Sequence, residues 1–231
     1  MKLIHGDCAK ELKKIPDRCV DMVMCDPPYG VTDCEWDTIV PFEPMWEELR
    51  RIVKPNGAIV LFTCQPFTTK LINSNMKMFR YCWIWKKNRA TGFLSANERP
   101  LNNYEELAVF SQQRIRYRPQ GVIHSIKKIK KSKTTEIYTN RKTEFYTSGT
   151  NYPKRVLEFD CVQNNVHPCQ KPVELLEYLI RTYTEENDVV LDFCMGSGST
   201  GVASLNLNRQ FIGIELNTEY FEIARNRICM V

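Results

Sequence analysis

Residues 192–201 read Asp192-Phe193-Cys194-Met195-Gly196-Ser197-Gly198-Ser199-Thr200-Gly201, and this stretch decides the fold. It follows a short apolar run and precedes a segment with helical spacing, and a second apolar run then ends at Glu215. Its three glycines satisfy the G-x-G-x-x-G pattern, in which the backbone approaches a nucleotide and a later acid binds ribose hydroxyls. The sequence therefore predicts a strand–turn–helix–strand unit that binds a nucleoside.

Two features of this unit indicate which nucleoside it binds. Only sixteen residues follow Glu215, too few for the strands that a dehydrogenase carries after such a loop, so we expect a circularly permuted sheet with its nucleotide-binding strand encoded late. Asp192 ends its strand just before the turn, where a carboxylate repels a pyrophosphate and attracts a methionine ammonium or a sulfonium group. S-adenosylmethionine is therefore favoured, with an NAD-dependent dehydrogenase as the alternative.

A second motif, Asp26-Pro27-Pro28-Tyr29, follows an apolar run at residues 20–25. The prolines fix φ and remove two backbone donors, so the carbonyl groups here have no competing N–H groups beside them. A planar amino group suits this arrangement, because Asp26 and the Pro27 carbonyl can accept its hydrogens while Tyr29 stacks on the attached base. Alone, the motif is equally compatible with a proline-stiffened strand exit; beside a nucleoside site, base binding is the favoured interpretation.

Apolar runs and helical periodicities alternate along most of the chain. Strand-like runs occupy residues 2–5, 20–25, 58–63, 80–86, 106–110, 189–191 and 211–214, and helical spacing covers residues 9–15, 44–53, 173–183, 200 onward and 220–228. This alternation predicts an α/β protein with a largely parallel sheet. The pattern lapses between the two ends, so we expect a core of residues 1–112 and 166–231 with a loop-rich insertion at 113–165.

The positive charge is concentrated in this insertion. Residues 111–150 hold ten Lys or Arg and two Glu, a formal net charge of +8, so the rest of the chain carries −3 of the overall +5. Tyr117, Tyr138, Phe145 and Tyr146 are interleaved with these cations. A charge run is ordinarily a solvated loop, but a local excess of this size with aromatic neighbours favours contact with a polyanion.

Together these motifs resemble the DNA amino-methyltransferases, which modify adenine N6 or cytosine N4, in the subgroup whose catalytic motif precedes the cofactor motif. The resemblance runs nearly from end to end. Residues 26–29 match the catalytic motif, residues 192–200 match the cofactor loop, and residues 167–172, His-Pro-Cys-Gln-Lys-Pro, resemble a motif that flanks the methionine end of the cofactor. Residues 89–93, Arg-Ala-Thr-Gly-Phe, further resemble phage and prophage members.

The resemblance implies a Rossmann-like, S-adenosylmethionine-dependent methyltransferase fold, with a seven-stranded, mostly parallel sheet and helices on both faces. An adenine flipped out of double-stranded DNA would stack on Tyr29, and the methyl group would pass directly to its amino nitrogen. The implied catalytic residues are Asp26, Pro27, Pro28 and Tyr29. The implied cofactor-binding residues are Asp7, His167, Gln170, Lys171, Asp192, Phe193, Gly196, Ser197, Gly198, Ser199, Thr200, Glu215 and Asn217. The expected DNA contacts are Arg89, Arg114, Arg116, Arg118, Lys127, Lys128, Lys130, Lys131, Arg141 and Lys142.

Several alternatives stay open. N4-cytosine enzymes more often have Ser where Asp26 stands, so the carboxylate favours adenine N6. Related Asn-Pro-Pro-Tyr enzymes act on RNA or on protein glutamine, and Asp26 and the motif order count against them. A DNA-binding protein without turnover would be marked by loss of Asp26, Tyr29 or the glycines, and all are present. Cys169 replaces the family's usual Thr and Phe193 its Asn or Pro, which puts the cofactor affinity in question.

The composition narrows the setting. The sequence shows neither an apolar stretch of membrane-spanning length nor an export signal, so we expect a cytoplasmic protein of a bacterial or phage-infected cell. Its ten cysteines fit neither a disulfide framework nor a zinc site, and we expect no metal and reduced, mostly buried thiols. A homodimer and a separate restriction endonuclease stay open as partners beside DNA.

Overall fold

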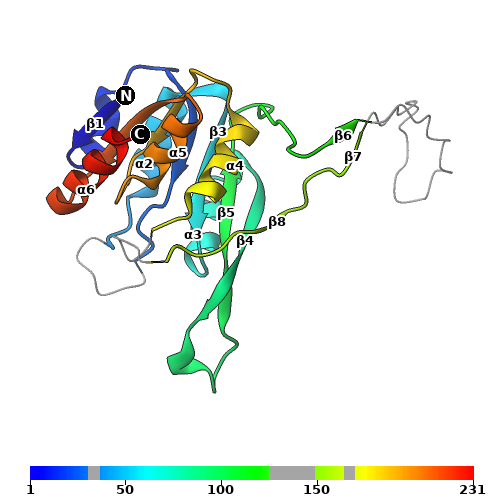
Figure 1. Ribbon diagram of the computed structural model, residues 1–231. Coiled ribbons are helices and arrows are strands. Elements are labelled where there is room, and N and C mark those ends of the chain that lie inside the picture. Colours follow the sequence, from blue (N-terminus) through cyan, green and yellow to red (C-terminus); the bar gives the residue numbers. More distant parts are fainter. Residues whose placement is uncertain (31–36, 125–148, 164–169) are drawn as a thin grey trace. The chain divides into compact units, whose positions relative to one another are not determined.

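The computed structural model describes residues 1–30, 37–124, 149–163 and 170–231. The backbone divides into one unit of residues 1–118 with 155–231 and a second of residues 119–154. The first unit contains a large sheet in the order β1-β10-β9-β2-β3-β5-β4-β8, with helices packed against it (Figure 1). In its described residues the second unit contains one short antiparallel pair of strands. It spans residues 119–154, fewer than the 113–165 of the expected insertion.

The element boundaries are close to the expected ones where apolar periodicity is strong. The strands are β1 (Lys2–His5), β2 (Val20–Cys25), β3 (Val53–Thr63), β4 (Phe79–Thr91), β5 (Asn102–Phe110), β6 (Ile123–His124), β7 (Gly149–Thr150), β8 (Val156–Glu158), β9 (Val189–Asp192) and β10 (Gln210–Glu215). The helices are α1 (Cys8–Glu11), α2 (Phe42–Ile52), α3 (Phe67–Ser74), α4 (Val173–Tyr183), α5 (Ser199–Asn206) and α6 (Thr218–Cys229), with 3-10 turns η1 (Leu12–Lys14) and η2 (Phe93–Ser95). The sequence does not predict α3, β6, β7 or β8.

The large sheet is mostly parallel, as expected. Five of its seven pairings are parallel, and the two exceptions join β5 to β3 and to β4. The expected number of seven strands is wrong, because the described sheet has eight. The additional strand, β8, pairs with β4 at one edge and buries only Leu157. Three residues with one buried side chain give no hydrophobic period that could indicate a strand.

Two cores cover the two faces of the sheet. Side chains alternate along the central strands, so Met22, Met24 and Phe62 pack with α4, α5 and α6. Val23 and Leu61 face the other way and pack with α2, α3 and the turn after α1. Because both sides of these strands are buried, they appear in the sequence as continuous apolar runs.

Strands β4 and β5 are longer than the apolar runs at residues 80–86 and 106–110. They continue as a two-stranded ribbon that extends beyond the rest of the sheet (Figure 1). The extension is largely exposed and polar, so hydrophobic periodicity does not indicate it. Since β5 runs antiparallel to β3, the ribbon leaves the sheet at the edge where β2, β3 and β9 end.

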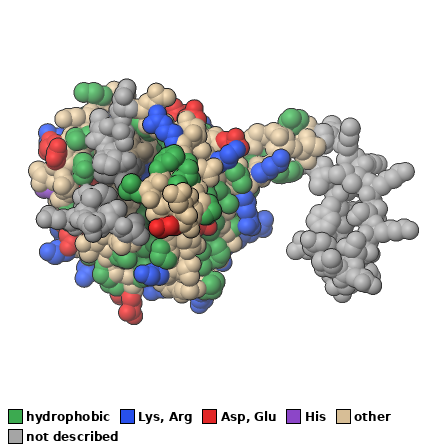
Figure 2. All heavy atoms as spheres, turned by 90° about the horizontal axis from the view of Figure 1, so that it is seen from below, with side chains coloured by type: hydrophobic (Ala, Val, Ile, Leu, Met, Phe, Trp, Pro, Cys, Tyr) green, Lys and Arg blue, Asp and Glu red, His purple; other side chains and the backbone are tan. Residues whose placement is uncertain are grey.

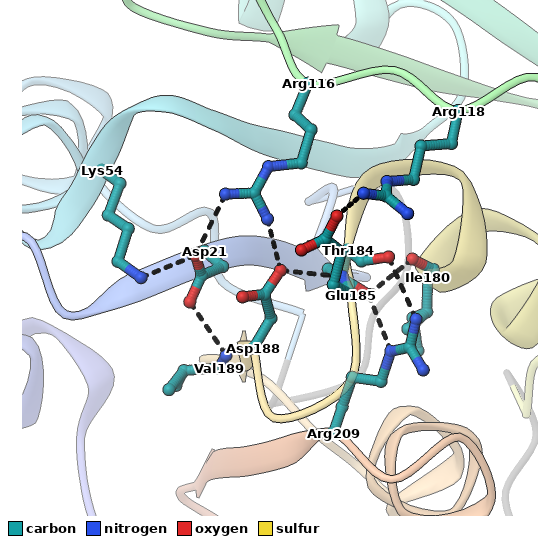
Figure 3. Close-up of polar contacts among 10 residues, drawn as sticks. All are labelled: Asp21, Lys54, Arg116, Arg118, Ile180, Thr184, Glu185, Asp188, Val189 and Arg209. Atoms are coloured by element: carbon teal, nitrogen blue, oxygen red, sulfur yellow. Dashed lines mark hydrogen bonds and ion pairs between the residues drawn. The ribbon is translucent and has the colours of Figure 1, made fainter.

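A polar cluster closes the opposite edge, where the parallel strands begin (Figure 3). Asp21 of β2 is buried, and its carboxylate accepts hydrogen bonds from Lys54 Nζ at 2.7 Å and the Val189 N–H at 3.0 Å. The Arg116 guanidinium lies 2.5 Å from the carboxylate of Asp188 and 3.8 Å from that of Asp21. These contacts attach the segment after β5 to the core, although the sequence places that segment in the insertion.

Replacing Arg116 by Leu is expected to lower the free energy of unfolding by about 1–3 kcal/mol, because Asp188 loses a charged hydrogen-bond donor and Asp21 loses a nearby cation. Urea unfolding at neutral pH measures the change. Arg114→Leu is the matched control, since Arg114 is exposed and has no ion pair within the described part of the chain. Equal losses in the two variants would show that the cluster adds nothing to stability.

Candidate functional site

A cavity of about 400 Å³ opens where β2 and β9 end, a volume within the range of small-molecule sites. The two strands are parallel neighbours, with Val23 opposite Leu191, so their following loops emerge at the same edge. The cavity is lined by both sequence motifs. The predicted site residues that line it are Asp7, Asp26, Pro27, Pro28, Tyr29, Gln170, Lys171, Asp192, Phe193, Gly196, Ser197, Ser199, Thr200 and Glu215.

Two predicted cofactor residues do not line this cavity, and His167 lies outside the described residues. Gly198 precedes α5 with φ of 80°, and a Cβ there would come within 2.9 Å of the Ala224 side chain, so this glycine permits close packing of α5 against α6. Asn217 caps α6, and its side chain accepts a hydrogen bond from the Tyr220 N–H at 3.0 Å. In this structure Gly198 and Asn217 therefore act on helices beside the site, Gly198 by letting α5 pack on α6 and Asn217 by capping α6.

Glu215 holds the glycine loop against the end of β10. Its Oε2 accepts a hydrogen bond from the Gly196 N–H at 2.8 Å, and its Oε1 accepts one from the Asn217 N–H at 2.8 Å. The loop closes further through the Met195 N–H, which donates to the Ile214 carbonyl at 2.9 Å. The carboxylate therefore fixes the loop geometry at the same place where a nucleoside hydroxyl would meet it.

Asp192 is a buried carboxylate at the end of β9. Its two oxygens accept hydrogen bonds from the Cys194 N–H at 3.1 Å and the Thr200 hydroxyl at 2.7 Å. Burial raises the pKa of Asp192 to about 7, and these hydrogen bonds oppose the rise only in part. No cation contacts it among the described residues, so this end of the cavity favours a positively charged ligand group.

The catalytic motif is held by a residue that the sequence does not single out. Asp37 is 7% exposed, and its Oδ1 accepts hydrogen bonds from the N–H groups of Tyr29 at 2.7 Å and Gly30 at 2.9 Å. The Tyr29 hydroxyl donates to Oδ1 of Asp26, and its ring lies against that of Phe67, with centroids 5.1 Å apart. A turn that closes eight residues later gives no local motif from which Asp37 could be predicted.

Lys171 contacts the catalytic motif, although the resemblance places it beside the cofactor. Its ammonium group donates a hydrogen bond of 2.5 Å to Oδ2 of Asp26 and lies 3.4 Å from Oε2 of Glu105. The other oxygen of Glu105 accepts a hydrogen bond from Lys87. Asp26 and Lys171 line the cavity, and Glu105 and Lys87 extend the row behind them, so two acids and two cations alternate across β4, β5 and the loops before α2 and α4.

Comparison with known proteins identifies the family of this arrangement. The family model described as DNA methylase, for N6 and N4 methyltransferases, matches residues 20–226. The chain belongs to the DNA methylase family. The matched region includes both loops of the cavity and Lys171.

Relatives of this DNA methylase extend over nearly the whole chain. It is 29% identical to the Type II methyltransferase M.HpaI of Haemophilus parainfluenzae, over 98% of this chain and 74% of the relative. It is 26% identical to the DNA adenine methyltransferase YhdJ of Escherichia coli K12, over 98% and 82%. Both names describe methyltransferases, and the second names adenine as its target.

Solved structures share the fold. The M1.HpyAVI–SAM complex superposes with a TM-score of 0.67 at 25% identity, covering 98% of both chains. The PvuII methyltransferase, whose title specifies cytosine N4, gives 0.71 at 17% identity over 97% of this chain and 85% of that one. Because the second identity is so low, that likeness shows the fold alone.

The predicted DNA contacts of the methylase lie in different surroundings. Arg89 is exposed on the β4–β5 ribbon and Arg114 is exposed after β5, whereas Arg116 and Arg118 form ion pairs with Asp188 and Glu185. On the face shown in Figure 2, Lys and Arg side chains are scattered among acidic and apolar ones. The remaining contacts lie outside the described residues: Lys127, Lys128, Lys130, Lys131, Arg141 and Lys142.

The eight cysteines in the described residues are free thiols, but the expectation that most are buried is wrong. Of the eight in the described residues only Cys25 is buried, Cys229 is exposed and the others are intermediate. Cys82 lies within β4 and packs against one core, and Cys64 lies just after β3. Within those residues no group of three His, Cys, Asp or Glu is placed to hold a metal ion. The described helices include none that is long and apolar enough to cross a membrane.

The raised pKa of Asp192 predicts a specific pH dependence of stability. Between pH about 4 and 7 the folded chain holds a proton that the unfolded chain has released, so the free energy of unfolding falls as the pH rises. Asp192→Asn removes the titrating carboxyl group. The variant is expected to be more stable than the parent at pH 8, by up to about 4 kcal/mol, and equally stable at pH 4. Urea unfolding across this range measures the difference. Parallel stability curves for the two proteins would contradict it.

Proposed function

We propose that this DNA methylase transfers a methyl group from S-adenosylmethionine to the exocyclic N6 of adenine in double-stranded DNA. The observation that supports this most directly is the single cavity that joins the glycine loop and the Asp26-Pro27-Pro28-Tyr29 motif. A methyl donor and an acceptor amino group have to meet within one site for direct transfer, and one cavity lined by both motifs provides that meeting point.

The end of the cavity beside β9 fits the cofactor. When bound, S-adenosylmethionine supplies a methyl group on a positively charged sulfur. The buried carboxylate of Asp192 lacks a cation among the described residues and would attract the positive charge of this ligand. Glu215 and Asp7 line the same end and would accept hydroxyl or amino hydrogens of its nucleoside.

The other end of the cavity fits the target base. Asp26 and the Pro27 carbonyl would accept the two amino hydrogens, while the Tyr29 ring stacks on the base. Burial raises the pKa of Tyr29, and the neighbouring Asp26 raises it further, so the phenol stays protonated and uncharged. These acceptors would orient the lone pair of the amino nitrogen toward the methyl group and stabilise the positive charge that develops there.

Adenine is preferred to cytosine on two grounds. Asp26 supplies a full carboxylate at the position where the N4-cytosine enzymes more often have Ser, and the relative YhdJ is named as an adenine methyltransferase. The likeness to the cytosine-specific PvuII enzyme concerns the fold alone. The proposal includes the bacterial cytoplasm as the location and leaves a homodimer and a separate endonuclease as further proposals.

Two parts of the chain are proposed to contact DNA. One is the basic segment of residues 111–150, whose net charge of +8 suits a phosphate backbone. The other is the tip of the β4–β5 ribbon, where Phe93 and Leu94 are 70% and 106% exposed and Arg89 is exposed nearby. The ribbon continues about 13 Å past Lys87 at the edge that bears the cavity, and exposed apolar side chains beside cations are suited to insert between base steps.

Asp26→Ala is expected to lower the rate of methyl transfer at least about 100-fold, because the amino group loses its charged acceptor. Tritium transfer from labelled S-adenosylmethionine to duplex DNA measures the rate. Calorimetric binding of S-adenosylmethionine is expected to stay within about threefold of the parent, and this binding also shows that the variant is folded. Full turnover by Asp26→Ala would contradict the assignment of Asp26 to catalysis. Modified-base sequencing of DNA from a host that expresses the parent enzyme tests the target base, and the appearance of N4-methylcytosine alone would exclude adenine.

The ribbon tip gives a separate prediction. Phe93→Ser with Leu94→Ser is expected to raise the Kd for duplex DNA about tenfold with an unchanged salt dependence, because the contact is apolar. Arg89→Ser is expected to lower the slope of log K against log salt by about 1. Fluorescence anisotropy at several salt concentrations measures both. Met76→Ser is the control, since Met76 is exposed just before β4 begins, at the opposite edge of the sheet. A Kd unaffected by the tip substitutions would exclude the ribbon from the interface.

A further inference from the structure

Lys171 is a nearly buried cation that contacts two carboxylates, Asp26 in the cavity and Glu105 behind it. It lies just before α4, 145 residues from Asp26, and its side chain is 9% exposed. Its ammonium group is 2.5 Å from Oδ2 of Asp26, 3.4 Å from Oε2 of Glu105 and 4.9 Å from the ring centroid of Phe62. A lysine is rarely this buried unless it is paired, so these contacts account for its position.

The two oxygens of Asp26 have partners of different strength. Oδ2 accepts from the charged ammonium of Lys171, whereas Oδ1 accepts from the neutral hydroxyl of Tyr29. The contact with Lys171 joins two opposite charges, whose Coulomb attraction adds to the hydrogen bond, whereas the contact with Tyr29 involves only the charge of the carboxylate. An arriving amino group therefore displaces the Tyr29 hydroxyl from Oδ1 more readily than it displaces Lys171 from Oδ2.

Glu105 completes the pairing of Lys171. Its Oε1 accepts from Lys87, and its Oε2 is buried without a hydrogen bond in the described residues, facing the ammonium of Lys171. Burial opposes ionisation of Glu105, but the two ammonium groups outweigh it and lower its pKa. The charges of Asp26, Lys171, Glu105 and Lys87 thus cancel, and the two acids hold the ammonium between them.

We propose that Lys171 is a positioning residue for methyl transfer, which holds Oδ2 of Asp26 so that Oδ1 faces the amino group of the target base. Glu105 in turn sets the position of Lys171. This inference rests on the proposed transfer function and differs from the cofactor contact that the resemblance implies for Lys171. It divides the cavity between a cofactor end without a fixed cation and a base end whose carboxylate is held by one.

Lys171→Met tests the proposal, because methionine keeps the unbranched apolar stem and removes the charge. We expect kcat to fall about 100-fold while the calorimetric Kd for S-adenosylmethionine stays within about threefold. Loss of the cation leaves Oδ2 of Asp26 without its charged partner, so the loss is expected in turnover and not in cofactor binding.

The double variant Lys171→Met with Glu105→Gln removes both buried charges and guards against misfolding of the single variant. It is expected to keep the low kcat with normal cofactor binding. Lys86→Met is the matched control, since Lys86 lies next to Lys87 on β4 but is exposed and paired with Glu158, and the kcat of this variant is expected within twofold of the parent. A parent-like kcat in either Lys171 variant would overturn the proposal, as would a Kd for S-adenosylmethionine that rises in step with the loss of turnover. Absence of adenine methylation by the parent enzyme, measured first, would instead contradict the proposed function.

Discussion

The parallel pairing of β2 with β9 is the constraint on which the site depends. These strands are far apart in the sequence, yet Met22 lies opposite Val190 and Val23 opposite Leu191. Since Asp192 directly follows Leu191 and Asp26 directly follows β2, the pairing brings two carboxylates to one edge. The same register places the glycine loop and the proline motif on the two sides of one cavity, so chemistry that needs both depends on the continuous apolar faces of these strands.

The acids where the parallel strands begin and Asp192 at the end of β9 differ in whether a cation pairs with them. At the edge where the strands begin, Asp21 and Asp188 are paired with Lys54 and Arg116, so their charges stabilise the attachment of neighbouring segments. At the edge where the strands end, Asp192 is buried with hydrogen-bond donors but no cation among the described residues. Its raised pKa is a cost to the empty fold that a cationic ligand would relieve.

The sequence predicts the parts of this molecule whose signal is local. The glycine loop, the proline motif and helices such as α2 follow from spacing within ten or so residues, and the structure places them as expected. Features set by distant partners are not predictable in this way. β3 continues through Pro55-Asn56-Gly57, where its register with β2 shifts, and the N–H groups of Gln113 and Arg116 donate to the carbonyls of Pro55 and Asn56. The exposed ribbon is held by strand pairing instead of burial. The expected number of seven strands is wrong because β8 also depends on a distant partner, β4, with which it pairs.

Lys171 shows how a family motif and a structure constrain different things. The family motif implies that this lysine lies near the cofactor, and Gln170 and Lys171 do line the cavity, but the motif does not say which end of the cavity the ammonium reaches. Glu105 on β5 helps to set this position, because its buried Oε2 lies 3.4 Å from the ammonium and forms an ion pair with it. A cation held between two acids cannot also neutralise Asp192, so the base end of the cavity has a fixed counter-charge and the cofactor end has none. This asymmetry suits a reaction in which the positive charge arrives with the donor and the acceptor enters neutral.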